Sequence, residues 1–233
     1  MKILLTGKDG QVGFALHKKL MSLGELIATG RHELDLSGPD AIKAFIDKIK
    51  PDIIINSAAY TQVDRAESEK LLAHQINAVA PQILTDKASE LNIPIIHFST
   101  DYVFDGSGDT PWAENDQTNP LSVYGQSKWL GECAVRQHCR KHLILRTSWV
   151  VGAHGNNFLK TMLRLAAERD GLRVVADQIG APTSADLLAK VTAGILRTML
   201  SAAQNDAGFG TYHLATAGET SWHAYAQYVV ADA

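Results

Sequence analysis

Tyr124 and Lys128 lie four residues apart in a stretch of helical periodicity, a spacing that puts both side chains on one face of a helix. An ammonium beside a phenol lowers the pKa of the phenol and lets it exchange protons near neutral pH. Thr100, 24 residues before Tyr124, adds a hydroxyl at the end of an apolar run. We therefore take Thr100, Tyr124 and Lys128 as candidate catalytic residues. The alternative for Tyr124 and Lys128 is an exposed helix pair, because this spacing also arises by chance.

A glycine-rich turn, residues 7–13, follows a predicted strand and opens a predicted helix. Glycines let the backbone approach a diphosphate, and the N–H groups at a helix start favour negative charge. The spacing GxxGxxG is typical of short-chain dehydrogenases, whereas the alternative is a turn that serves only tight packing. The turn supplies five candidate cofactor-binding residues: Gly7, Gly10, Gln11, Val12 and Gly13.

The end of the second predicted strand, Thr29-Gly30-Arg31, carries no acid at its tip. Folds that prefer NAD usually present a carboxylate there to the ribose 2′-hydroxyl, whereas a guanidinium suits the 2′-phosphate of NADP. Arg31 is therefore a candidate cofactor ligand, with a solvated surface charge as the alternative. The expected cofactor is NADPH, with NADH as a second cofactor. Asp35 and Leu36 follow and are placed near the adenine.

Small residues follow the third predicted strand, where an open α/β sheet binds its ligands. We expect the cofactor to lie across them: Ala58, Ala59, Tyr60 and Thr61. Asn77 lies in a helical stretch, and we expect it to bond to the backbone or to hold a water.

Short β-branched runs alternate with segments of helical period, which predicts successive βαβ units and a parallel sheet. The fold class is α/β: a Rossmann-type doubly wound parallel sheet with a smaller C-terminal substrate-binding lobe. A loop is expected over residues 105–120, and helices are expected to start near residues 37–40 and 221. Strands are predicted at residues 2–6, 25–29, 52–57, 94–99, 142–148, 173–176 and 212–215.

Two domains are predicted. Residues 1–150 form the NADP(H)-binding Rossmann domain, and residues 151–233 contribute the last strands and part of the substrate lobe. The net charge of −3 gives no reason to expect a nucleic-acid partner. The first apolar run is too short for a signal peptide, and Cys133 and Cys139 are expected to be free thiols. We expect a cytoplasmic protein without membrane association.

Six stretches together resemble the dTDP-4-dehydrorhamnose reductases, a family of extended short-chain dehydrogenases, and the similarity runs along the whole chain. The stretches are residues 7–13, 58–67, 99–106, 120–128, 146–149 and 175–183. The resemblance implies reduction of the 4-keto group of dTDP-4-dehydro-6-deoxy-L-mannose by hydride from NAD(P)H. This reaction is the last step in the biosynthesis of dTDP-L-rhamnose.

The resemblance also implies roles for single residues. Tyr124 would protonate the C4 alkoxide, Lys128 would lower the pKa of Tyr124 and hold the nicotinamide ribose, and Thr100 would hydrogen-bond the keto oxygen. Asp101 and Trp149 would contact the sugar together with Thr100 and Tyr124. The cofactor would be lined by Gly10, Gln11, Val12, Asp35, Leu36, Ala59, Tyr60 and Thr61.

The chain departs from the family in two respects. Family members continue for several dozen residues past residue 233, so part of the substrate lobe is expected to be absent. Some members dimerise through a metal held by carboxylates, but the first helix here carries Phe14-Ala15, and Asp186 in the later region is followed by Lys190. No metal site is predicted, and the protein is expected to be a monomer or a homodimer.

Two other functions compete with the reductase. One is a nucleotide-sugar epimerase or dehydratase on the same scaffold, against which the context of Trp149 and Asp177-Gln178 argues. The other is a non-catalytic cofactor-binding regulator, against which the intact set of Thr100, Tyr124 and Lys128 argues.

Overall fold

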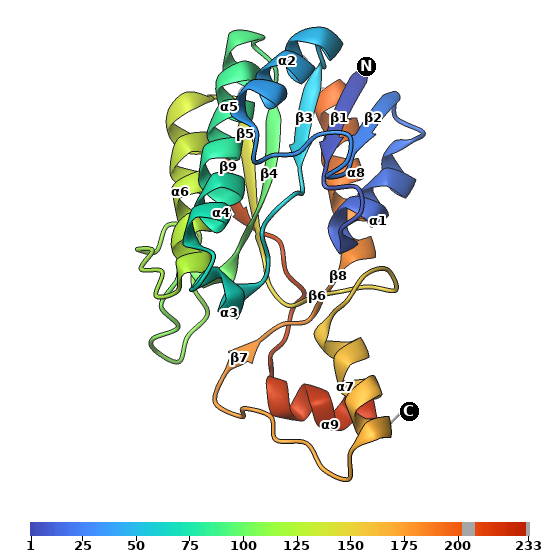
Figure 1. Ribbon diagram of the computed structural model, residues 1–233, viewed down its shortest axis with the longest axis vertical. Helices are drawn as coiled ribbons and strands as arrows, with labels where there is room; N and C mark the ends of the chain where they lie inside the picture. The colour runs from blue at the N-terminus through green and yellow to red at the C-terminus, as the bar shows by residue number, and fades with distance from the viewer. Residues whose placement is uncertain (202–207, 232–233) are drawn as a thin grey trace.

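A six-stranded parallel sheet forms the centre of the molecule, with the strand order β2-β1-β3-β4-β5-β9 (Figure 1). The structure, a computed structural model, describes residues 1–201 and 208–231. The strands are β1 (Lys2–Thr6), β2 (Glu25–Thr29), β3 (Ile53–Asn56), β4 (Ile95–Thr100), β5 (His142–Thr147) and β9 (Gly210–His213).

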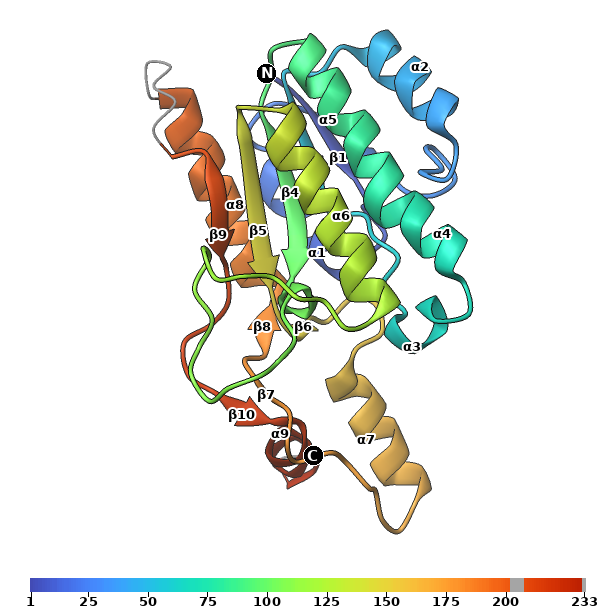
Figure 2. The same cartoon turned by 90° about the vertical axis from the view of Figure 1, so that its left-hand side faces the viewer.

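Helices cover both faces of this sheet (Figures 1 and 2). One face packs against α1 (Gln11–Leu20) and α8 (Ala185–Ser201), and the other against α2 (Pro39–Ile49), α5 (Ala80–Glu90) and α6 (Val123–His138). All four residues of β3 are buried, as expected for a parallel strand with both faces covered. Short helices α3 (Val63–Ala66) and α4 (Lys70–His74), and a π-helical turn at Gln75–Val79, lead into α5.

A smaller lobe lies beyond the carboxyl ends of the strands (Figure 1). It contains α7 (Phe158–Glu168), α9 (Trp222–Ala231) and the antiparallel pair β7 (Ile179–Gly180) and β10 (Thr220–Ser221). A second short pair, β6 (Val150–Val151) with β8 (Thr183–Ser184), leads from the sheet to the lobe. The lobe has an apolar cluster of its own around Met162, Ala226 and Val229. Residues after 150 thus supply both this lobe and two elements of the main domain, α8 and β9.

The predicted fold class, a Rossmann-type parallel sheet with a smaller lobe, is confirmed. The first five strands were predicted to within one residue at each end, and the sixth lies two residues earlier than expected. The strand predicted at residues 173–176 was wrong: Val174 packs into the apolar cluster of the lobe, Val175 is exposed, and the segment pairs with no strand. An apolar residue can be buried without a β-partner, and the sequence pattern does not distinguish the two cases.

The helix starts and the loop were predicted correctly. Helix α2 begins with Pro39 in its first turn, although the N-cap is Gly38 rather than Ser37, and α9 begins at Trp222. Residues 105–120 form neither helix nor strand. Asp232 and Ala233, which the sequence pattern continues as helix, lie outside the described residues. Among the helices of the described chain, none combines the length and the apolar character needed to span a membrane.

Candidate active site

The carboxyl end of β4 and the first turn of α6 bring Thr100, Asp101 and Tyr124 together. Thr100 ends β4, Asp101 opens a short 3₁₀ turn, and Tyr124 lies in the first turn of α6, where the Ser122 hydroxyl caps the helix by accepting from the Gly125 N–H. The helix can approach so closely because residue 125 is glycine: a Cβ there would lie 2.3 Å from the Tyr102 carbonyl oxygen. Gly125 therefore lets the first turn of α6 pack against residue 102, which places Tyr124 beside Thr100.

Tyr124 is buried, and burial raises the pKa of its hydroxyl well above the usual value, while the neighbouring Thr100 hydroxyl opposes this rise. The ring of Tyr102 packs edge-on against it, with centroids 5.5 Å apart. The sequence predicted a lowered pKa from the nearby Lys128. In the structure of the chain this is wrong, because burial raises the pKa of the phenol and the neighbouring charge of Asp101 raises it further.

Lys128 lies one turn further along α6 and is 2% exposed. Its Nζ donates a hydrogen bond to the Phe98 carbonyl oxygen at 2.7 Å. Burial lowers the pKa of this amine to about 8, and the carboxylate of Glu132 opposes the shift. Lys128 is therefore a buried amine that can change its charge within a unit or so of neutral pH.

Thr100 is hydrogen-bonded to the two residues that follow it in the chain. Its Oγ1 accepts from the Tyr102 N–H at 3.2 Å and donates to Asp101 Oδ1 at 2.9 Å. Burial raises the pKa of Asp101 to about 6, although the hydrogen bonds from Thr100 and from backbone N–H groups oppose the rise. Hydroxyl, carboxyl and phenol thus lie next to one another in a site from which water is largely excluded.

The glycine-rich turn between β1 and α1 fits a diphosphate. Gly7 has a φ of 80°, and a Cβ on Gly13 would lie 1.9 Å from the Gly7 carbonyl oxygen, so the backbone conformation requires the first glycine and close packing requires the second. Gly10 is the N-cap of α1 and offers no side-chain cap. The first N–H groups of α1 have no helical partner and face the carboxyl edge of the sheet, where an anionic group would satisfy them.

Gln11 and Val12 differ in what they do at the start of α1. Val12 packs against the apolar core on the α1 face of the sheet. Gln11 ties the turn to the segment that leads into the lobe: its Nε2 donates to the Val150 carbonyl oxygen at 3.2 Å, and its Oε1 accepts from Asn157 Nδ2 at 2.9 Å. Asn157 also caps α7. One side chain therefore connects the cofactor turn with the first helix of the lobe.

The end of β2 differs from the sequence-based expectation. A carboxylate does lie at its tip, because Glu33 accepts from the Gly30 N–H at 2.8 Å and pairs with Lys8 of the glycine-rich turn. The Lys8 ammonium and the Gly30 N–H hold the pKa of Glu33 below its usual value. Arg31 is exposed, 3.9 Å from Asp35. The sequence did not predict this carboxylate, because Glu33 lies three residues after Gly30 and only the turn of the folded chain brings its side chain back to the Gly30 N–H.

The remaining cofactor candidates divide between surface and core. Asp35 accepts from the Ser37 N–H and hydroxyl, which lowers its pKa, and Leu36 is 7% exposed in the core on the α2 face. Ala58 packs closely against Gly7, Ala59 is half-buried and Thr61 is exposed. Leu36 is therefore a residue of the apolar core.

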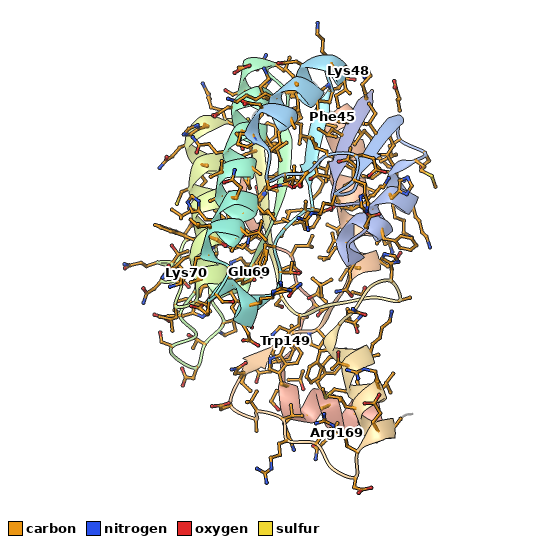
Figure 3. The ribbon with its side chains drawn as sticks, in the orientation of Figure 1. Phe45, Lys48, Glu69, Lys70, Trp149 and Arg169 are labelled. Atoms are coloured by element: carbon orange, nitrogen blue, oxygen red, sulfur yellow. The ribbon has the colours of Figure 1, made fainter. Side chains whose placement is uncertain are left out.

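Asn77 holds Tyr60 in place, which confirms the expected bond to the backbone. Its amide accepts from the Tyr60 N–H, donates to the Tyr60 carbonyl oxygen and also reaches Ser127 Oγ on α6. The Tyr60 hydroxyl donates at 2.8 Å to Glu69, the residue just before α4, which is labelled in Figure 3. The sequence did not predict that Asn77 links the end of β3 to α6, the helix of Tyr124; an asparagine in an otherwise apolar helical stretch was the available signal.

Trp149 lies where the sheet meets the lobe (Figure 3). Its backbone has a φ of 43°, and its ring stacks on Trp222 with centroids 3.5 Å apart. Asp186, considered for a metal, pairs with Lys19 at 3.1 Å. In residues 1–201 and 208–231, no three His, Cys, Asp or Glu side chains are grouped as metal ligands.

A family model described as the RmlD substrate binding domain matches residues 1–233. The chain is 51% identical to the dTDP-4-dehydrorhamnose reductase of Shigella flexneri, over all of this chain and 78% of that protein. The chain belongs to the dTDP-4-dehydrorhamnose reductase family. The resemblance found in the sequence is thereby confirmed.

Solved structures of this family agree with the fold. The dTDP-4-dehydrorhamnose reductase of Clostridium acetobutylicum superposes with a TM-score of 0.91 at 40% identity, covering 98% of this chain and 79% of the other. That of Bacillus anthracis, solved in complex with NADP, gives 0.90 at 35% identity, covering 99% of this chain and 80% of the other.

Proposed function

We propose that this chain is the reductase that converts dTDP-4-dehydro-6-deoxy-L-mannose to dTDP-L-rhamnose with NADPH. The observation that carries the proposal is the meeting of Thr100, Tyr124 and buried Lys128 at the carboxyl end of β4, in a chain of this family. A family member that holds NADP supports the cofactor. NADH is proposed as a weaker alternative.

Tyr124 is the proton donor in this proposal. The bound cofactor supplies hydride to C4 of the sugar. The raised pKa of Tyr124 keeps its hydroxyl protonated at neutral pH, so that the proton is present when the far more basic alkoxide develops at the former keto oxygen. The Thr100 hydroxyl hydrogen-bonds the same oxygen and stabilises its growing charge. Lys128 holds the nicotinamide ribose and contributes positive charge when protonated.

The binding residues are assigned from their places in the fold. The glycine-rich turn holds the diphosphate at the α1 N-terminus, and Arg31 is the proposed ligand of the 2′-phosphate. Asp101 and Trp149 are the proposed contacts of the sugar nucleotide, since Asp101 is hydrogen-bonded to Thr100 and Trp149 lies where the sheet meets the lobe. The cofactor is further lined by Asp35, Leu36, Ala58, Ala59, Tyr60 and Thr61.

Further assignments accompany this function. Residues 1–150 would form the cofactor domain, with residues 151–233 completing the sheet and supplying part of the substrate lobe. The dTDP-sugar is the proposed partner, without nucleic acid, membrane or metal, and the protein would act in the cytoplasm as a monomer or a homodimer.

One assay tests the activity against its alternatives. Purified protein is mixed with NADPH and dTDP-4-dehydro-6-deoxy-L-mannose, and loss of the reduced-nicotinamide absorbance is followed while the product is identified by mass spectrometry. The expected product is dTDP-L-rhamnose, formed in equal amount to the NADPH oxidised. Conversion of dTDP-sugars without net NADPH oxidation would support an epimerase or dehydratase. Cofactor binding without turnover would support a regulator.

A further inference from the structure

Three buried polar residues form a row across the centre of the sheet. Thr6 of β1 lies in register with Asn56 of β3, and Asn56 lies in register with His97 of β4. Their side chains share the face covered by α5 and α6, because Leu4, Ile54 and Ile95, two residues earlier on each strand, pack there. All three are at most 1% exposed. A row of this kind in an otherwise apolar sheet needs a physical reason, because buried polar groups cost free energy unless they are hydrogen-bonded.

Hydrogen bonds run along this row and end on Lys128. Thr6 Oγ1 donates to Asn56 Oδ1 at 2.6 Å, and Asn56 Nδ2 lies 3.0 Å from His97 Nδ1. The other ring nitrogen, His97 Nε2, lies 3.4 Å from Lys128 Nζ. The Lys128 amine is thus placed between the His97 ring and the Phe98 carbonyl oxygen, both on β4.

The row has one hydrogen-bonding arrangement for each charge state of Lys128. With the Asn56 amide nitrogen facing Nδ1, as in the structure, Nδ1 accepts and Nε2 carries the ring proton, which a neutral amine can accept. If the amide turns over, Nδ1 donates to Oδ1 and Nε2 accepts from an ammonium. The two amide orientations have nearly the same shape, so the amine need not move when its charge changes.

We propose that His97, held by Asn56 and Thr6, is a positioning residue for Lys128, which it keeps in place and hydrogen-bonded in both charge states. The proposal rests on the proposed function, in which Lys128 binds the cofactor ribose. His97 touches neither substrate nor cofactor in it and acts through Lys128 alone.

The charges around the row support this role. Burial and the Lys128 amine hold the pKa of His97 well below its usual value, so the ring stays neutral and does not repel the ammonium. On α6, the carboxylate of Glu132 raises the pKa of Lys128 and is itself bound by Arg146 of β5, through Nε and Nη2, and by Arg136 through Nη1. Because His97 is neutral and the charge of Glu132 is compensated by arginine, neither group locks the Lys128 amine in one charge state.

The experiment measures Lys128 directly, in protein labelled with ¹³C at the lysine ε-carbons. The Lys128 signal is identified by its absence from Lys128→Arg, and its midpoint is followed against pH, together with the pH dependence of NADPH affinity. The variants are His97→Leu, which removes both ring nitrogens, and His97→Gln, whose amide can turn either way. Thr85→Val is the matched control, since Thr85 is equally buried and its hydroxyl donates only within α5.

In the parent and in Thr85→Val we expect a midpoint near 8. His97→Leu should lower it by about one unit, because an ammonium loses more than an amine when a charge-assisted hydrogen bond is removed. NADPH affinity should then weaken at a correspondingly lower pH, and His97→Gln should restore both. A folded His97→Leu protein with the parent midpoint overturns the proposal.

A second variant covers the case in which His97→Leu does not fold. His97→Asn keeps polarity toward Asn56 but is too short to reach Nζ, and it should show the same downward shift; an unchanged midpoint again overturns the proposal. Neither readout uses the sugar. A protein without reductase activity but with the shifted midpoint would contradict the proposed function and leave the role of His97 intact.

Discussion

The Thr100 hydroxyl donates a hydrogen bond to the Asp101 carboxyl group, with 2.9 Å between Oγ1 and Oδ1. A hydroxyl has one proton, so Thr100 cannot donate to a keto oxygen while it donates to Asp101. When Asp101 is protonated, its carboxyl can donate to Thr100 instead, which frees the Thr100 proton for the substrate. The protonation state of Asp101 is therefore part of the site's chemistry.

Asp101→Asn should stabilise the protein at neutral pH but not at acidic pH. Burial raises the pKa of Asp101 from 3.8 to about 6, so the stability gained from its neutral form is fully present below 3.8 and lost as the pH rises through 6. Asparagine has no charge to bury. The measurement is urea unfolding of the parent and the variant at pH 4 and at pH 8. The free energy of unfolding of Asp101→Asn minus that of the parent should be roughly 1 to 3 kcal/mol larger at pH 8 than at pH 4. An equal difference at both pH values would contradict the burial of an ionisable carboxyl here.

Tyr124→Phe should abolish most turnover while leaving NADPH affinity nearly unchanged. The substitution keeps the buried ring but removes the proton donor, and general acid catalysis typically contributes a factor of about 10² to 10⁴. Stopped-flow oxidation of NADPH with saturating sugar nucleotide measures the loss. Thr100→Val should cost an intermediate amount. Lys128→Met should weaken NADPH binding in addition to slowing the reaction.

Tyr212→Phe is the control for this series. It removes an exposed hydroxyl, on Tyr212 of β9, that donates to the Gly208 carbonyl oxygen and contacts no residue of the proposed site. A Tyr124→Phe enzyme that is folded by circular dichroism and reduces the sugar within a few-fold of the parent rate would remove Tyr124 from the mechanism.

Cofactor preference should respond in opposite directions to two substitutions at the end of β2. Arg31→Ala removes the proposed phosphate ligand and should raise the Kd for NADPH more than that for NADH. Glu33→Gln removes a carboxylate beside Gly30 and releases the Lys8 ammonium, so it should favour NADPH over NADH. Each change should be roughly twofold to fivefold, because these charges are exposed. Fluorescence titration with both cofactors measures the ratio, and parallel changes for NADPH and NADH would disprove a role in selectivity.

The sequence predicted those features that depend on local pattern. Apolar runs and glycine turns located the sheet, and the four-residue spacing placed Tyr124 and Lys128 on one helix. What it missed depends on contacts between distant segments. The Glu33 carboxylate bonds back to Gly30. His97 is a single polar residue in an apolar stretch of sequence, and only the register of β3 and β4 shows that it lies beside Asn56. The error over the pKa of Tyr124 has the same origin, since burial is set by packing that spacing alone does not reveal.

Trp149 should lose its orientation when Gly180 gains a methyl group. A Cβ on Gly180 would lie 2.5 Å from Cε2 of the Trp149 ring, so the indole must move, and Trp149 stacks on Trp222 at 3.5 Å. Gly180→Ala should therefore raise the KM for the sugar nucleotide, change the near-ultraviolet circular dichroism of the tryptophan pair, and destabilise the protein by about 1 to 3 kcal/mol. NADPH affinity should change little, because the atoms that a Cβ on Gly180 would meet all belong to Trp149 and none to the glycine-rich turn.

Two further variants separate orientation from general loss of packing. Gly171→Ala is the matched control, since a Cβ there would meet no heavy atom within 4 Å, and it should leave KM and the spectrum unchanged. Trp222→Leu keeps an apolar residue at the start of α9 but removes the stacking partner, so it should reproduce the spectral change and the higher KM without a clash at Gly180. If Trp222→Leu alters the spectrum but leaves the KM at the parent value, the stacked position of Trp149 is not what binds the sugar, and its proposed contact with substrate must be abandoned.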